Sequence, residues 1–210
     1  LHVRSRRQRQ MCIRDRPEEI DVEEKNIELM DKFPFLIKPV DSSGGRGVYV
    51  CNNMEDMNNK IERSLKFSES NKVLIEKYYD CEEITAFFFF DQGEIILTSV
   101  ADRIVQSIEG STIKLPTGYI FHSKYYDAFK TNVFPKIEKL FKSLNIQNGM
   151  LFAQCLVDGN DFRIYDIGYR LTGSLEYIVF EQMFDFNPLE ELIYFSTSGQ
   201  YKTCLLYTSP

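Results

Sequence analysis

Apolar positions along the chain predict an alternation of short strands and amphipathic helices. A short apolar run at 33–40, with prolines near both ends, predicts a strand, and 48–51 predicts another after a glycine-rich turn. Apolar side chains then recur at every third or fourth position over 54–65, which is the spacing of an amphipathic helix. A further strand is expected to begin at 73.

Two strand pairs are expected between 84 and 167. Each pair consists of apolar runs on either side of a short polar turn that contains glycine, a sequence typical of β-hairpins. The run of four phenylalanines at 87–90 predicts a strand that is covered on both faces. The expected pairs are 84–90 with 94–100, turned at 91–93, and 150–157 with 162–167, turned at 158–160.

Helices and one loop complete the predicted elements. An apolar stripe over 129–144 predicts a helix that Pro135 kinks or divides. Two further helices are expected near 175–183 and 188–198, whereas 101–122 shows mixed turn chemistry without a period and predicts a mobile loop. This order of elements favours an α+β fold with antiparallel sheets in two lobes.

Both ends of the chain have the character of sequencing-adapter sequence. The DNA that would encode 204–209 reads on its opposite strand as 11–15, which two unrelated protein tails have no reason to do. We therefore expect 1–16 and 204–210 to be adapter artefact, with a natural basic arm as the alternative, and 17–32 to be a linker or the remnant of a preceding region.

Net charge argues against nucleic acid as a partner. The whole chain has 25 Lys and Arg against 31 Asp and Glu, and the expected artefact segments hold six of the arginines and one aspartate. The remainder carries a net charge of −11. Sequence-independent nucleic-acid binding depends on lysine and arginine at phosphates, so this class of function is disfavoured.

Cysteine content and hydropathy indicate a cytoplasmic protein. Outside the expected artefact, Cys51, Cys81 and Cys155 are an odd number at no metal-like spacing and predict free thiols in a reducing compartment. No apolar run approaches the roughly 20 residues that span a bilayer, so we expect no membrane partner.

A lysine followed by a glycine-rich loop is the most informative segment. Glycines let backbone amides approach phosphate oxygens, and a nearby lysine adds a positive charge for the same oxygens. An ordinary glycine-rich hairpin loop is the alternative. The candidate phosphate-binding residues are Lys38, Ser43, Gly44, Gly45 and Gly47.

Three segments together resemble the ATP-grasp superfamily. The first is the lysine and glycine loop, and the second is the strand from 73 to 79, which is similar to the superfamily's adenine-binding hinge. The resemblance implies that Glu76, Lys77, Tyr78 and Tyr79 bind adenine through backbone groups. It also implies that Glu83 holds the ribose hydroxyls, with Glu82 as the rival for that role.

The third segment is the hairpin over 150–167. The resemblance implies that Gln154 and Asp166, twelve residues apart on paired strands, are ligands of a Mg²⁺ ion that bridges ATP phosphates. A solvated hairpin with incidental polar residues is the alternative. Asp166 replaces the usual glutamate, and Gly168 stands where an asparagine ligand is usual, which puts a second metal in doubt.

Arg170 matches the superfamily's arginine that faces the transferred phosphate, a role for which a planar guanidinium is suited. Together with Lys38 it is the expected catalytic residue. Arg103 is either another phosphate or substrate contact or an exposed surface arginine.

The resemblance to the carbamoyl-phosphate-synthetase-like branch of the superfamily implies a two-lobe ATP-grasp fragment that clamps ATP between antiparallel sheets. The small lobe would comprise 33–79 and the large lobe 80–203. The implied activity is a ligase that activates a carboxylate as an acyl phosphate for attack by an amine, with a possible homodimer in the full-length protein. Two alternatives are a non-catalytic ATP-binding module and a purely structural protein.

Overall fold

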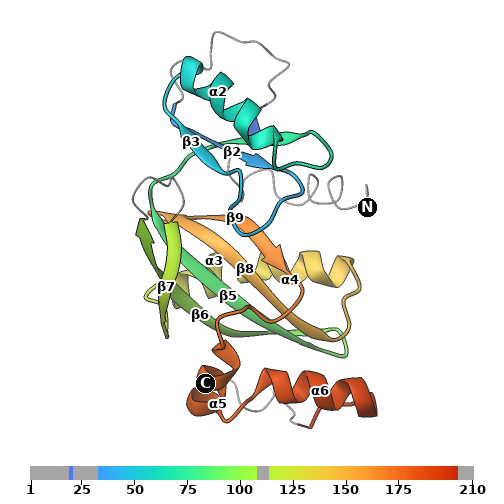
Figure 1. Cartoon of the computed structure of the whole chain (residues 1–210). Helices are drawn as coiled ribbons and strands as arrows, with labels where there is room; N and C mark the ends of the chain where they lie inside the picture. The colour runs from blue at the N-terminus through green and yellow to red at the C-terminus, as the bar shows by residue number, and fades with distance from the viewer. Residues whose placement is uncertain (1–18, 21–32, 108–113, 203–210) are drawn as a thin grey trace. The chain divides into compact units, whose positions relative to one another are not determined.

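The computed structural model describes residues 19–20, 33–107 and 114–202 (Figure 1). The expected adapter segments lie outside these residues, and of the expected linker only Glu19–Ile20 is described, as a short strand. The chain divides into two compact units. The smaller unit contains the described residues up to Cys81 together with Ile104–Gly118, and the larger contains Glu82–Arg103 and the described residues from Tyr119 onward.

The smaller unit is a four-stranded sheet with one helix. Its strand order is β1-β4-β2-β3, and both neighbours of β2 run antiparallel to it. The helix packs on the sheet through a core of Phe35, Ile37, Cys51, Met57 and Ile75. The elements are β1 (Glu19–Ile20), β2 (Phe35–Pro39), β3 (Tyr49–Cys51), α2 (Met54–Leu65) and β4 (Val73–Lys77).

A second, five-stranded sheet has the order β7-β6-β5-β8-β9, and its strands β5, β8 and β9 and most of β6 belong to the larger unit. Helices follow β7 and β9 along the chain. The elements are β5 (Glu82–Asp91), β6 (Glu94–Ser107), β7 (Lys114–Ile120), α3 (Tyr126–Asn132), α4 (Phe134–Ser143), β8 (Gly149–Asp158), β9 (Asp161–Gly168), α5 (Glu176–Phe184) and α6 (Pro188–Ser198).

Strand β5 is buried on both faces, as its run of phenylalanines predicts. Phe88 and Phe90 lie in one core with α3 and α4, through side chains that include Phe129 and Phe141. Phe87 and Phe89 lie in a second core, on the opposite face, with residues of the α5–α6 segment. Because successive strand residues point to opposite faces, one strand supplies both cores.

The prediction of a loop over 101–122 is wrong. Strand β6 continues to Ser107, and Lys114–Ile120 forms β7, while 108–113 lies outside the described residues. The strand was not recognised because Asp102 and Arg103 interrupt the alternation of apolar and polar residues. Both side chains instead bind partners within the fold. Pro116 is tolerated because β7 lies at the edge of the sheet, where an N–H is not needed on the outer side.

The predicted helices are confirmed. Pro135 divides the apolar stripe, because α3 ends at Asn132 and Pro135 stands in the first turn of α4, where a missing N–H costs nothing. Within the part of the chain that the structure describes, no helix is long and apolar enough to cross a membrane.

Phe88→Ala should lower the free energy of unfolding by about 3–5 kcal/mol, the usual cost of removing a buried phenylalanine ring. The Phe88 ring is fully buried and lies 6.1–6.3 Å from the rings of Phe129, Phe134 and Phe141. Urea unfolding followed by circular dichroism measures the change. Ile193→Ala, at a side chain that is 57% exposed, is the matched control and should change the value by less than about 0.5 kcal/mol. Equal effects of the two substitutions would contradict this assignment of the core.

Candidate nucleotide and metal site

The glycine-rich loop of the smaller unit follows β2 directly and is largely exposed. Gly44, Gly45 and Gly47 all have positive φ, between 64° and 77°, a conformation that favours glycine. At Gly47 an added Cβ would lie 2.8 Å from Pro39 and 2.9 Å from Phe67, whereas at Gly44 it would meet nothing within 4 Å. The loop thus packs on its own unit at Gly47 and presents open backbone at Gly44.

Asp41 anchors the start of this loop. Its carboxylate accepts a hydrogen bond of 2.7 Å from the Ser70 amide. Hydrogen bonds from the Ser68 side chain and the Ser70 backbone hold the pKa of Asp41 below its usual value. An ionised Asp41 therefore ties the start of the loop to the turn before β4.

Lys38 forms an ion pair with Glu76 inside the smaller unit. Its Nζ lies 2.6 Å from Oε2 of Glu76, and the side chains are 25% and 6% exposed. Leu36 pairs with Glu76 across β2 and β4, so Lys38 is the diagonal neighbour of Glu76 on the same face. The predicted phosphate ligand is therefore held in place by a carboxylate, a role of Glu76 that sequence reasoning missed.

The hinge residues continue from this strand. Glu76 and Lys77 end β4, and the Tyr78 amide donates a 3.1 Å hydrogen bond to the Pro34 carbonyl. That amide is used within the unit, so it is not a donor for a nucleotide in this conformation. Tyr79 follows β4 and lies outside the regular strand.

In the larger unit, Gln154 and Asp166 lie directly opposite each other on β8 and β9. Gln154 is half-buried and Asp166 is exposed. Paired strand residues bring their Cβ atoms within about 5.5 Å, a separation that lets one cation contact both oxygens. A pair of oxygen donors open to solvent fits Mg²⁺, which keeps several waters and binds through one or two protein ligands plus phosphate.

A β-bulge at Tyr165 creates this pairing. Gln154 pairs with Asp166, but Cys155 pairs with Ile164, so Tyr165 is an extra residue in β9. Ile164 and Ile167, three apart, both pack on the core that faces α3 and α4. Without the bulge, strict alternation would turn Asp166 into that core. The bulge instead turns it to the opposite face.

Glu83, the predicted ribose ligand, belongs to a buried network. Its Oε2 accepts hydrogen bonds from Nη1 of Arg103 at 2.7 Å and from the Tyr165 hydroxyl at 2.8 Å, and Arg103 also donates to the Tyr165 hydroxyl. Glu83 and Arg103 are 14% and 7% exposed. The expectation that Arg103 lies on an exposed surface is therefore wrong, and two hydrogen-bond donors fix the direction of the Glu83 carboxylate.

Tyr165 is neutral in this network. Burial raises the pKa of its hydroxyl far above the usual value of 10, and the nearby Glu83 carboxylate raises it further. Glu82, the rival of Glu83, has an exposed side chain that accepts hydrogen bonds from Lys124 and Tyr125. Of the two, Glu83 is the one that lies on the face shared with Thr85 and its cross-strand partner Gln154.

Arg170 follows β9 and stacks on an aromatic ring. Its Cζ lies 5.0 Å from the centroid of Phe152, and its Nη1 donates to the Leu171 carbonyl at 2.8 Å. Gly168, opposite Phe152, contributes no side-chain donor. Among the described residues no group of three His, Cys, Asp or Glu is close enough to hold a metal.

Sequence reasoning missed two residues of this site, Tyr165 and Phe152. The spacing of Ile164 and Ile167 was the available signal for a bulge, because three residues between core positions breaks the alternation of a strand. For Phe152, the glycine opposite it is visible only once the register is known.

These features are those of an ATP-grasp protein. The family model of the ATP-grasp domain matches residues 31–174, and the chain belongs to this family. The expected α+β fold with antiparallel sheets is confirmed.

Among curated relatives, a D-alanine–D-alanine ligase from Petrotoga mobilis is 28% identical over 136 residues, which cover 63% of this chain and 41% of that protein. A carbamoyl phosphate synthase large chain from Clostridium beijerinckii is 23% identical over 150 residues, covering 70% of this chain and 14% of that protein. The chain thus spans less than half the length of these relatives.

Solved structures share the fold. An L-amino acid ligase from Bacillus licheniformis superposes with a TM-score of 0.69 at 14% identity, over 92% of this chain and 46% of that one. The biotin carboxylase domain of Hydrogenobacter thermophilus 2-oxoglutarate carboxylase, in complex with MgADP, gives 0.70 at 16% identity, over 94% and 45%.

Tyr165→Phe should make the free energy of unfolding fall less steeply as the pH rises above 10. An unfolded tyrosine ionises near pH 10, whereas folded Tyr165 stays protonated because its pKa is raised. Its contribution to folding is therefore complete below pH 10 and declines above it, by up to about 1.4 kcal/mol per pH unit. The variant should be less stable than the wild type at pH 8 by about 1–3 kcal/mol, the cost of losing hydrogen bonds to a buried charge.

Urea unfolding between pH 8 and 11 tests this. The difference between the two proteins should shrink as the pH rises above 10. Parallel pH profiles for wild type and variant would show that Tyr165 is not held neutral by the fold.

Proposed function

We propose that this chain is the nucleotide-binding and phosphoryl-transferring part of an ATP-dependent ligase that joins a carboxylate to an amine. The observation that carries the proposal is the directly opposed pair Gln154 and Asp166, with Arg170 two residues after the end of β9, in a member of the ATP-grasp family. The names of the relatives support the class, because D-alanine–D-alanine ligase and L-amino acid ligase both join amino acids.

The smaller unit would contribute the phosphate-binding groups. Lys38 supplies a charge whose direction is set by Glu76, and Ser43, Gly44 and Gly45 supply exposed backbone that approaches phosphate oxygens without obstruction. Contacts within the unit fix the two ends of the glycine-rich loop, at Asp41 and at Gly47. Such fixed donors reduce the cost of orienting a triphosphate.

The larger unit would contribute the metal ligands and the oxyanion contact. Gln154 and Asp166 would hold Mg²⁺, which when bound neutralises charge on the phosphate oxygens. Arg170 would offer its planar donors to the transferred phosphoryl group or the acyl phosphate. Glu83, already oriented by Arg103 and Tyr165, has lone pairs suited to accept hydrogen bonds from ribose hydroxyls.

A non-catalytic ATP-binding module is the second candidate. Two observations favour it: Asp166 is one methylene shorter than the glutamate expected from the resemblance, and Gly168 supplies no ligand. Both functions predict nucleotide affinity, and only the ligase predicts substrate-dependent ADP release.

Lys38→Ala should weaken binding of MgATP, and Asp166→Asn should lower the rate of ADP release by about 100-fold or more, as expected for loss of a group that stabilises transferred charge. Calorimetry measures binding, and a coupled assay measures Mg²⁺-dependent ADP release with pools of carboxylates and amines. Release that requires a substrate pool and disappears in Asp166→Asn supports the ligase.

Matched controls separate the site from general effects. Asp161→Asn changes an exposed carboxylate on the same strand, and Lys139→Ala removes an exposed lysine on α4. Both should leave binding and release unchanged. Nucleotide binding that depends on Lys38, without ADP release from any pool, would overturn the ligase in favour of the binding module.

A further inference from the structure

Position 168 can hold a side chain only if a neighbouring aromatic ring moves, because that ring occupies the space where a Cβ would lie. Gly168 lies opposite Phe152 across β8 and β9. A Cβ added to Gly168 would lie 2.3 Å from Cε1 and 2.4 Å from Cζ of Phe152, far inside van der Waals contact. The φ of Gly168 is not positive, so the requirement for glycine comes from the ring rather than from the backbone.

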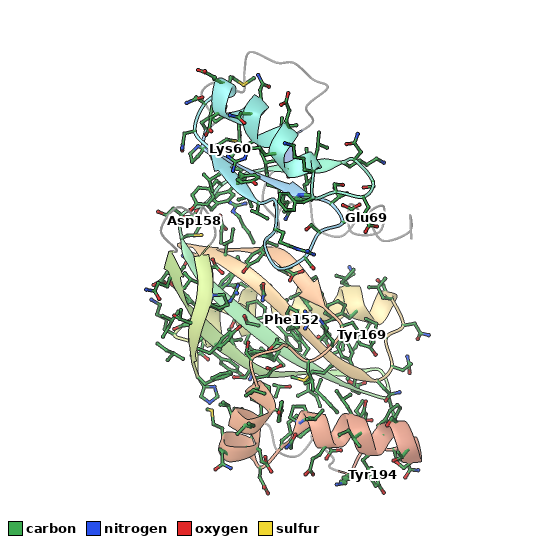
Figure 2. All side chains as sticks on the ribbon, viewed as in Figure 1. Lys60, Glu69, Phe152, Asp158, Tyr169 and Tyr194 are labelled. Atoms are coloured by element: carbon green, nitrogen blue, oxygen red, sulfur yellow. The ribbon has the colours of Figure 1, made fainter. Side chains whose placement is uncertain are left out.

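The ring itself is held firmly by the core. Phe152 is 3% exposed and belongs to the cluster that includes Met150, Phe87 and Phe180. It lies on the sheet of the larger unit (Figure 2). A ring packed in this way cannot turn aside to admit a side chain at 168 without disturbing its neighbours.

The outer face of the same ring carries Arg170. The guanidinium carbon lies 5.0 Å from the ring centroid, within the range of a cation–π contact. The backbone around it is tied down as well, because the Thr172 amide donates a 2.6 Å hydrogen bond to the buried carboxylate of Glu176. Arg170 is exposed, and its side chain is restrained by the ring and by the hydrogen bond from its Nη1 to the Leu171 carbonyl.

Phe152 also sets the distance from Arg170 to the candidate metal ligands. Phe152 and Gly168 are two residues along from Gln154 and Asp166 on their strands, so both pairs lie on one face about 7 Å apart. We propose that Phe152 is a positioning residue, whose ring rests on Gly168 and holds the guanidinium of Arg170 beside the Gln154–Asp166 pair. This inference rests on the proposed function for the role of Arg170, but the contact itself does not. It also implies that position 168 supplies no ligand to a metal.

Arginine side-chain NMR of the 210-residue chain tests the contact without any turnover. The Nε–Hε signal of Arg170, assigned by its loss in Arg170→Lys, should show an upfield ring-current shift. Phe152→Leu should return the signal to its unshifted position, and Gly168→Ala should also move it, because the methyl group displaces the ring. Gly173→Ala is the matched control, since a Cβ there meets nothing within 4 Å, and it should leave the signal in place. An Arg170 signal that does not respond to Phe152→Leu overturns the proposal.

The double variant Phe152→Leu/Gly168→Ala separates positioning from packing. The smaller leucine makes room for the added methyl, so the double variant should be more stable than Gly168→Ala, yet it lacks an aromatic face for Arg170. Its ADP release should be slower than that of the wild type by about 3- to 30-fold, the range of a cation–π contact, with the KM for ATP changed less. Recovery of the wild-type rate and Arg170 signal would mean that only the packing matters, and this would overturn the proposal. If the wild type releases no ADP but its Arg170 signal responds to Phe152→Leu, only the proposed function fails.

Discussion

Burial of β5 on both faces is the constraint on which the larger unit depends. A strand whose side chains are all covered must lie inside the sheet, so β6 and β8 have to pair with its two edges. Phe87–Phe90 supply the two cores in alternation, and the register of both neighbours follows from that burial, because a slip of one residue would exchange the cores. The polar end of β5, with Glu83 and Thr85, meets the polar part of β6 beyond a register shift, because Phe88 pairs with Leu97 and Phe87 with Ser99.

The candidate site arises where that regular register is broken. The bulge at Tyr165 gives β9 one extra residue, and this has two effects at once. It turns Asp166 away from the apolar core toward Gln154, and it directs the Tyr165 hydroxyl to Glu83. The candidate metal-ligand pair and the contact of Tyr165 with the Glu83–Arg103 network therefore both involve this one bulge. Bulges commonly re-aim side chains in this way at functional sites.

Much of the fold could be predicted from local sequence, because turn residues and apolar periods specify the elements directly. The two hairpins, the division of a helix at Pro135 and the burial of Phe87–Phe90 follow from such signals. The continuation of β6 past Val100 could not, since Asp102 and Arg103 are satisfied by partners far along the chain and give no alternation.

Site residues were harder to place than elements. Counting back from the turn at 158–160, regular pairing would set Tyr165 against Gln154, and the spacing of twelve was known only from the resemblance to a family. The pairing of Gln154 with Asp166 needs the bulge, which shifts the register by one residue. Such a shift changes the amino-acid composition of the strand very little. Likewise, no sequence rule connects Lys38 with Glu76, because their contact is diagonal between strands that are far apart in sequence.

The pairing of Lys38 with Glu76 has a consequence for which anions the protein can retain. An anion that reaches Lys38 must compete with a carboxylate already 2.6 Å away, and that carboxylate is too buried to be rehydrated freely when its partner is drawn off. Under the function proposed above, a singly charged ion such as chloride would gain little to offset this loss. A chain of phosphates that meets several donors at once would gain more, so the ion pair would favour polyanions over simple ions.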